Sequence, residues 1–265
     1  MPLTESLLRH SQTPIVIGHR GASKLAPENT MPAFIAAFSA GALWIETDVQ
    51  PTADNVLVLI HDDEVDRTTN GTGDIRSLSA DAALNLDAGS WFTSEHESDN
   101  EFAGTRIPLL TDLLALVTGD RRILLEIKGD HTSEQLTIML QQIHGAGCDE
   151  RVFLQSFEVP VLERLRVLVP QDPIGLLVET IHNDPVAECR RLGATVYNPH
   201  FAELLRRPGL VAELHSAGIA TTPWTSDSPD DWATLTNLGV DGIITNRPDE
   251  LVAWQADSQA ARADG

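Results

Sequence analysis

The sequence contains few cysteines, few cationic side chains and no long apolar run. Only Cys148 and Cys189 occur among 265 residues, so no disulfide framework is present. No stretch approaches the roughly 18 consecutive apolar residues that a membrane-spanning helix requires. Lys and Arg number 18 against 39 Asp and Glu, which gives a net charge of −21. That charge argues against general affinity for polyanions, so we expect no nucleic-acid partner and no stable membrane association.

A signal-peptide pattern is missing as well. Residues 1–14 contain no apolar core of the required length, and Glu5, Arg9 and His10 interrupt them. We therefore expect a cytoplasmic location. Hydrophobic residues make up 42% of the chain and charged residues 22%, which is typical of a globular protein with a sizeable core. The length allows one large α/β domain or two small ones.

Apolar strand patterns alternate with helical patterns along the chain. The helical patterns cover 133–144, 159–168, 185–192, 209–217, 229–238 and 248–254, and we expect the tail after Gln255 to fray. Strand-like runs begin near residues 15, 44, 122, 151, 174, 195, 219 and 241. Eight such units in about 250 residues predict a TIM (β/α)8 barrel. The alternative is a doubly wound sheet, which the lack of Gly-x-Gly-x-x-Gly after the first strand disfavours.

Two features interrupt the repeat. Residues 43–50 and 56–60 flank a turn, so they predict a β-hairpin. If the turn is centred between Asp54 and Asn55, His61 lies approximately opposite Asp48. Residues 63–105 are irregular, with a short helix within 77–86, and contain too few apolar residues for a core of their own. We interpret 63–105 as a small insertion after the second-strand hairpin, within a single TIM-barrel catalytic domain that spans 1–265.

Charged side chains collect at the carboxyl ends of the predicted strands, where a barrel carries its active site. Residues two apart on a strand face the same way, so Glu46 projects with Asp48, and Glu126 with Lys128. Three carboxylates at one barrel mouth repel one another unless a cation joins them, and they are the ligands that Ca²⁺ or Mg²⁺ prefers. The alternative, a solvated surface strand, fits poorly because 123–125 is continuously apolar. We expect one divalent metal ion.

Two histidines accompany these acids. His19 ends the first strand, and the hairpin returns His61 towards the carboxylates. Such a pair suits general acid and base roles near neutral pH, although a lone histidine is usually structural. Arg20 and Lys128 add fixed positive charge for a phosphate-like group.

The motifs together resemble those of the glycerophosphodiester phosphodiesterases. They follow the family's order over residues 15–250: His19-Arg20-Gly21, Pro27-Glu28-Asn29-Thr30, Glu46-x-Asp48, His61-Asp62, Glu126-x-Lys128, and the Asp-Gly-Ile-Ile-Thr-Asn-x-Pro run at 241–248. The resemblance implies a TIM barrel with a small insertion after the His-Asp motif. It also implies a divalent metal on Glu46, Asp48 and Glu126, with His19 and His61 as the catalytic pair.

The same resemblance implies an activity and further roles. Arg20 and Lys128 would hold the phosphate, Glu28 would sit at the mouth, and Trp224 would form a wall beside the glycerol moiety. The expected reaction is metal-dependent hydrolysis of a small-molecule glycerophosphodiester to sn-glycerol 3-phosphate and an alcohol. The sequence leaves open the headgroup, the metal, the oligomeric state and which histidine is the acid.

Two other functions are alternatives to this one. A lysophospholipase-D-like enzyme acting on acyl-bearing lysophospholipids needs an apolar groove, to which Phe92, Phe102 and Phe201 could contribute. A non-catalytic binding module that kept the fold would have lost a histidine or an acid, and none is lost.

Overall fold

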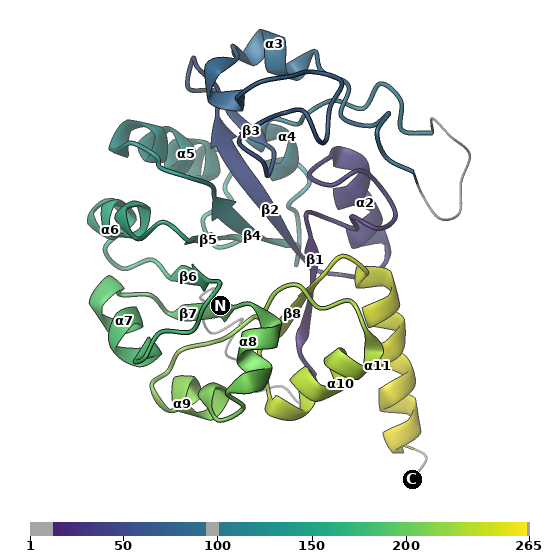
Figure 1. The fold of residues 1–265 in the computed structure, drawn as a ribbon, viewed down its shortest axis with the longest axis vertical. Helices are drawn as coiled ribbons and strands as arrows, with labels where there is room; N and C mark the ends of the chain where they lie inside the picture. The colour runs from purple at the N-terminus through teal and green to yellow at the C-terminus, as the bar shows by residue number, and fades with distance from the viewer. Residues whose placement is uncertain (1–12, 94–100, 264–265) are drawn as a thin grey trace.

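A curled, eight-stranded sheet forms the centre of the molecule. The computed structural model describes residues 13–93 and 101–263. Seven strands lie in the order β7-β6-β5-β4-β2-β1-β8 with parallel neighbours, and β3 pairs with β2 outside this path. The seven are β1 (Ile15–His19), β2 (Trp44–Pro51), β4 (Arg122–Ile127), β5 (Val152–Ser156), β6 (Ile174–Val178), β7 (Val196–Pro199) and β8 (Gly242–Thr245). With helices around its outside (Figure 1), the sheet confirms the predicted fold class.

The helices begin and end where the sequence supplies caps. Thr132 opens α5 with a capping box, and the side chains of Asp184 and Ser228 cap α7 and α10. Gly193 and Gly239 end α7 and α10 in the left-handed conformation. The described helices around the sheet are α2 (Met31–Ser39), α4 (Leu110–Leu114), α5 (Ser133–Gly145), α6 (Val159–Leu168), α7 (Pro185–Leu192), α8 (Phe201–Arg206), α9 (Leu210–Ser216), α10 (Pro229–Leu238) and α11 (Pro248–Ala263).

One predicted strand, 219–224, is not a regular strand. It forms isolated bridges at Ala220 and Trp224 only, because Pro223 has no N–H to continue a ladder. Ala220 still bonds through both backbone groups to the β7 edge, at 2.9 and 3.0 Å. On the other side, the N–H of Ile244 in β8 donates to the Pro223 carbonyl at 3.1 Å. The segment therefore closes the barrel between β7 and β8.

The predicted hairpin is present, but its register differs by one residue from the prediction. β2 pairs with β3 (Leu57–Leu59) so that Asp48 lies opposite Ile60, whose N–H donates to the Asp48 carbonyl at 3.1 Å. His61, predicted at this place, follows it. The turn contains three residues, 53–55, and Asn55 adopts the left-handed conformation with φ 61°. The turn is therefore centred on Asp54 and not between Asp54 and Asn55, which accounts for the shift of one residue.

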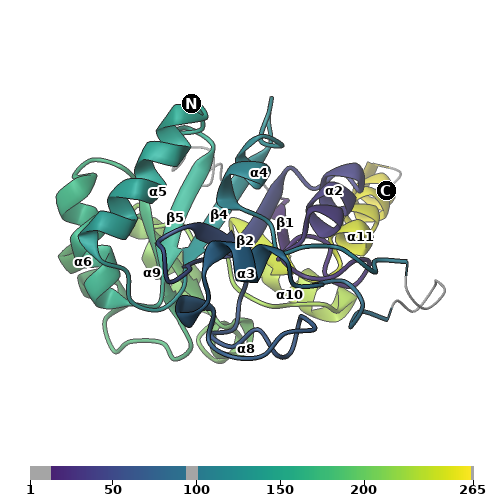
Figure 2. The same ribbon diagram turned by 90° about the horizontal axis from the view of Figure 1, so that it is seen from above.

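Residues 63–105 contain the short helices η1 (Ile75–Ser77) and α3 (Ala80–Leu84); residues 94–100 of this range lie outside the described residues. The predicted helix at 77–86 is thus shorter than expected. The segment lies at the same end of the barrel as α8 (Figure 2). Together with β3 it buries a small apolar cluster: Val58, Ile60, Val65, Ile75, Ala83, Ala88 and Ile107. That this segment is an insertion within one domain spanning 1–265 stays a prediction.

The last helix is longer than predicted. α11 continues past Trp254 to Ala263, so the expected fraying from Gln255 was wrong. The side-chain amides of Gln255 and Gln259 donate to the Pro14 carbonyl (2.9 Å) and to the Thr13 hydroxyl (3.2 Å), which attaches the helix to the chain before β1. Across the described residues, no helix combines the length and the apolar character needed to cross a membrane.

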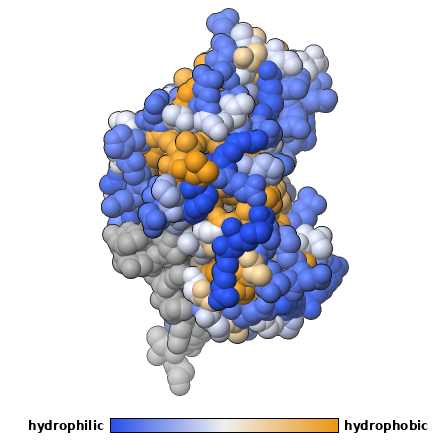
Figure 3. Space-filling model, turned by 90° about the vertical axis from the view of Figure 1, so that its left-hand side faces the viewer, coloured by the Kyte–Doolittle hydropathy of each residue, from blue (hydrophilic) through white to orange (hydrophobic). Residues whose placement is uncertain are grey.

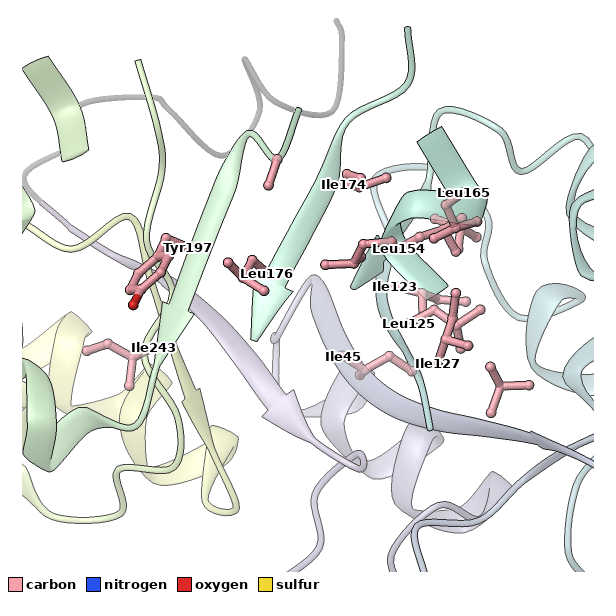
Figure 4. Close-up of a cluster of buried hydrophobic side chains, with 14 of the residues drawn as sticks. Ile45, Ile123, Leu125, Ile127, Leu154, Leu165, Ile174, Leu176, Tyr197 and Ile243 are labelled. Carbon is pink, nitrogen blue, oxygen red and sulfur yellow. The ribbon is translucent and has the colours of Figure 1, made fainter. Parts of the chain in front are cut away.

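Alternate residues of the strands enter two separate apolar cores. Ile123 and Leu125 point outwards and pack in the layer shared with Leu165 of α6 (Figure 4). The inward residues form an apolar layer inside the barrel: Ile17, Trp44, Leu124, Phe153, Val196, Ala220 and Ile244. Glu126 and Gln155 are the next inward residues on β4 and β5. The apolar layer therefore lies directly beneath a polar layer and separates it from solvent on that side.

Candidate active site

The first strand delivers two polar side chains to the barrel mouth. β1 ends at His19, and Arg20 follows in the left-handed conformation with φ 55°. In this conformation the Arg20 N–H donates to Glu46 Oε2 at 3.1 Å, while its Nε lies 3.4 Å from Asp48 Oδ2. A Cβ at Gly21 would lie 2.5 Å from the backbone of α2, so only glycine permits this close approach.

Three buried carboxylates from β2 and β4 meet beside Arg20. Glu46, Asp48 and Glu126 each offer an oxygen within 4.8 Å of the others. Burial, followed by the charge of Asp48, raises the pKa of Glu126 to about 7, and burial with both neighbours raises the pKa of Glu46. Although burial opposes it, Arg20 lowers the pKa of Asp48. The cluster thus carries more negative charge than its surroundings stabilise.

The hydrogen bonding of Asp48 indicates whether a metal ion fits between the three carboxylates. Asp48 Oδ2 accepts from Asn29 Nδ2 at 2.8 Å, whereas Oδ1 is buried and has no hydrogen-bond partner among the described residues. A buried acceptor without a partner is costly. Three carboxylate groups, one with an unsatisfied oxygen, match the hard-oxygen chemistry of Ca²⁺ or Mg²⁺. The residues present therefore fit a divalent ion.

His61 reaches the same place from the loop after β3. The Gln50 amide donates to the carbonyls of Ile60, His61 and Asp62, at 3.3, 3.1 and 2.8 Å, and so shapes this loop. His61 Nδ1 lies 2.6 Å from Asp62 Oδ1. Since a carboxylate only accepts, Nδ1 carries the proton and Nε2 is left for the cavity, 3.1 Å from Lys128 Nζ. Burial lowers the pKa of His61.

His19 is oriented in a similar way by an amide. Asn246 donates its backbone N–H and its Nδ2 to Asp227, at 2.8 and 2.6 Å, so its Oδ1 is an acceptor. That oxygen lies 2.7 Å from His19 Nδ1, which therefore carries the proton. Burial, and then the charge of Arg20, lowers the pKa of His19 to about 4. The imidazole is neutral at pH 7, with the lone pair on Nε2.

These groups surround one cavity of about 350 Å³. Its charged lining comprises His19, Arg20, His61, Lys128, Glu179 and two of the three carboxylates of the triad. The rest of the lining is uncharged: Gln155, Phe157, Leu177, Trp224, Thr225 and Ile244. Phe157 and Trp224 meet edge to face with ring centroids 5.4 Å apart. The cavity can accept a ligand with one anionic end and one uncharged end.

Glu28 lies behind this cavity rather than in its lining. Its Oε1 accepts from Arg20 at 2.7 Å, and both its oxygens accept from Arg67 at 2.8 Å. Although burial opposes it, bonding from Arg67 and Arg20 lowers the pKa of Glu28 to about 2. Arg67, from the 63–105 segment, also donates to both oxygens of Asp62, at 2.5 and 3.0 Å. One guanidinium therefore joins the loop after β1 to the loop that carries His61.

Known proteins resemble this chain over nearly its whole length. The sequence model described as the glycerophosphoryl diester phosphodiesterase family matches residues 19–250. The chain belongs to this family. A glycerophosphodiester phosphodiesterase of Caldanaerobacter subterraneus subsp. tengcongensis is 37% identical, in an alignment covering 90% of this chain and 96% of the relative. The predicted family membership is confirmed.

Solved structures of similar proteins share the fold. A putative glycerophosphoryl diester phosphodiesterase from Silicibacter pomeroyi superposes with a TM-score of 0.86 at 26% identity, covering 98% of this chain and 99% of the other. A phosphodiesterase from Oleispira antarctica, in complex with the product sn-glycerol-3-phosphate, gives a TM-score of 0.84 at 25% identity, covering 92% and 97%.

The structure brings most of the predicted family residues together. The cavity is lined by seven of them: His19, Arg20, Glu46, His61, Glu126, Lys128 and Trp224. Asp48 is buried beside the other two acids, and Glu28 lies on the far side of Arg20. The role of each in binding or catalysis stays a prediction.

No role was predicted for the residues that orient this set. Asn29, Asp62 and Asn246 belong to the motifs shared with the family, so a signal for them was present. Gln50 shares a strand face with Asp48, two residues away, which is a weaker signal. Arg67 had no signal in its spacing, because its partners Glu28 and Asp62 come from separate loops.

Proposed function

We propose that this protein hydrolyses glycerophosphodiesters to sn-glycerol 3-phosphate and an alcohol with the help of one bound Ca²⁺ or Mg²⁺. The observation that carries the proposal is one cavity in which two histidines and two cationic side chains border a buried carboxylate triad. Family membership and the product bound to the Oleispira antarctica relative support it.

Arg20 and Lys128 are proposed to bind the phosphate. Both cations line the cavity, and each is already held by a carboxylate, Arg20 by Glu28 and Lys128 by Glu126 at 3.0 Å. Because these cationic side chains are already fixed in position, they can stabilise the charge that develops on the phosphate oxygens without having to move during the reaction. A divalent ion held by Glu46, Asp48 and Glu126 would supply Lewis-acid stabilisation of the same oxygens.

We infer different roles for the two histidines from their partners. His19 is neutral, sits beside the cation Arg20 and has a free lone pair on Nε2, so it suits the general base. His61 suits the general acid that protonates the leaving alkoxide, because its anionic partner Asp62 stabilises the imidazolium form and so opposes the lowering of the His61 pKa by burial. The nucleophile is either water or the neighbouring 2-hydroxyl of glycerol, and both routes use the same pair.

The lysophospholipase-D-like alternative lacks support in the described residues. Phe92 and Phe102 pack edge to face with each other, 5.6 Å between centroids, and neither they nor Phe201 lines the cavity. Among the described residues, the large exposed apolar side chains are Ile35, Leu43 and Val167, and none of them lines the cavity. The face over α5, α6 and α7 shows apolar patches among hydrophilic residues (Figure 3), and a groove of about 620 Å³ there is lined in part by Leu140, Ile143 and Leu168. This groove shares no lining residue with the cavity that carries the two histidines, so it does not provide the apolar groove beside the mouth that an acyl chain needs.

A coupled assay for released glycerol 3-phosphate tests the proposal. The enzyme is offered glycerophosphodiesters with several headgroups, and in parallel a lysophospholipid, with Ca²⁺, with Mg²⁺ and with a chelator. We expect release from the glycerophosphodiesters that is abolished by the chelator and restored by the metal. Absence of release with any metal would remove the proposal, and faster turnover of the lysophospholipid would favour the alternative.

A further inference from the structure

A buried amide on β5 directs an unused hydrogen-bond donor towards the cavity. Gln155 is completely buried and belongs to the cavity lining. Its Nε2 has no hydrogen-bond partner among the described residues. Buried amide groups are normally satisfied by protein or by a ligand, so a free donor at this place calls for an acceptor from within the cavity.

The orientation of this amide is set by a chain of bonds that begins at the backbone. The Thr222 N–H can only donate, and it donates to Asn198 Oδ1 at 2.8 Å. Asn198 therefore presents Nδ2 on its other side, where it donates to Gln155 Oε1 at 2.8 Å. With Oε1 used as an acceptor, Gln155 must present Nε2, an N–H group, to the cavity.

The strand between them leaves room for this amide pair. β6 separates β5 from β7, and Gly175 is the β6 residue next to Gln155 in the ladder. A Cβ at Gly175 would lie 3.1 Å from Gln155 Cβ and 3.7 Å from Asn198 Nδ2. Because glycine occupies this position, the two amides can meet across an intervening strand.

Asn198 also holds a second residue of the same wall. Its backbone carbonyl accepts from Trp224 Nε1 at 3.0 Å. The Trp224 indole N–H is thereby occupied, so Trp224 offers the cavity its ring surface, and Gln155 offers a neutral donor. Both line the cavity, and Gln155 lies next to Glu126 in the β4–β5 ladder.

We propose that Gln155 donates a hydrogen bond to a hydroxyl oxygen of the glycerol moiety, and that Asn198 is the positioning residue that holds Gln155 and Trp224. This inference rests on the proposed function. With the phosphate bound at Arg20 and Lys128, the glycerol would extend along the part of the lining formed by Gln155 and Trp224, where the Trp224 ring packs against its carbons. A site built to bond a hydroxyl rejects analogues that lack it, because its donor is then left unpaired.

Product binding by the metal-loaded enzyme tests the proposal without turnover. Calorimetry compares sn-glycerol 3-phosphate with propyl phosphate, which has the same phosphate and three carbons but no hydroxyl, and with inorganic phosphate. We expect the wild type to prefer sn-glycerol 3-phosphate. Gln155→Leu and the less disruptive Gln155→Met should reduce that preference about tenfold, the size expected for one neutral hydrogen bond, and leave propyl phosphate affinity unchanged.

Two further variants separate positioning from general structure. Asn198→Ala should reduce the same preference, whereas a merely structural role would leave the ratio of the two affinities unchanged. Gln141→Leu, at an exposed position on α5, is the matched control and should retain the wild-type ratio. Thermal unfolding of each variant verifies that it is folded.

Three outcomes would overturn the inference. The first is a folded Gln155→Met with the wild-type preference. The second is an equal loss of affinity for propyl phosphate, which would assign Gln155 to the phosphate. The third is a weakened affinity for the metal alone, which would assign it to the metal site. If the wild type hydrolyses no glycerophosphodiester, the proposed function is wrong. The binding comparison still tests the role of Gln155 in that case, because it does not depend on turnover.

Discussion

Neutral amide side chains hold the ionisable residues of this site in place. Asn29 is hydrogen-bonded to Asp48, Gln50 to the loop that carries His61, and Asn246 to His19. An amide has a donor end and an acceptor end, so a partner of known polarity at one end determines what the other end presents. The protonated nitrogen of His19 is determined in this way, through Asn246 and Asp227.

The histidine assignment predicts large kinetic effects. His19→Ala and His61→Ala should each lower kcat by about 10² or more, because each removes one proton-transfer partner. Steady-state assays with saturating metal measure this, and calorimetric titration with metal alone shows whether the carboxylate site is intact. Turnover near the wild-type rate in either variant would contradict the assignment.

The placement of site residues was predictable from the sequence where charge and spacing coincide. Glu46 and Asp48 stand two apart on an apolar strand, so a shared face followed from strand geometry. Gln155 could not be identified in this way, because a neutral residue in an apolar run resembles packing. Its significance depends on Asn198 and Gly175, which lie on two other strands.

At the scale of helices, strands and turns, the local sequence predicted the bounds of the helices better than the conformation of the turns. The bounds of α6, α7 and α10 agree with the sequence pattern because proline, a cap residue or glycine marks their ends. The hairpin register depended on one backbone conformation, at Asn55, and the closing segment depended on Pro223. Neither residue changes the apolar pattern that the prediction used.

Arg67 connects the 63–105 segment to Glu28 and Asp62 of the site. We therefore expect a substitution of Arg67 to affect catalysis although the residue does not line the cavity. Arg67→Gln should lower kcat about tenfold with little change in KM, because Asp62 loses its bonds from the guanidinium and holds His61 less firmly. Arg67→Lys should recover part of the loss. The Arg67 side chain is 45% exposed, so substitution should leave the fold intact.

Arg191 provides the matched control for Arg67. It also joins two carboxylates, Glu163 and Glu188, but on the exposed surface of α6 and α7. Arg191→Gln should retain the wild-type kcat. A loss in Arg67→Gln that appears equally in Arg191→Gln, or a rise in KM alone, would argue against a positioning role for Arg67.

For the whole molecule, the buried acids predict that metal and pH together control stability. The pKa of Glu126 is about 7 in the folded state against 4.5 ordinarily, so the carboxyl binds protons more readily when folded. Ionisation of Glu126 therefore does not affect the free energy of unfolding well below pH 4.5, and it lowers that free energy as the pH rises from 4.5 towards 7. The raised pKa of Glu46 acts in the same direction, and the lowered pKa of Asp48 acts in the opposite one.

Thermal unfolding with chelator or with Ca²⁺ or Mg²⁺ measures this linkage. Metal should raise the midpoint by roughly 5 °C or more at pH 7.5 and by less at pH 5, where protons compete for the same oxygens. Glu126→Gln should raise the metal-free midpoint at pH 7.5 and lose most of the metal-induced shift, whereas Glu163→Gln, exposed on α6, should behave as the wild type. An equal metal shift at both pH values, or one retained in Glu126→Gln, would show that the ion binds elsewhere, because only ions coordinated by this triad must displace its protons.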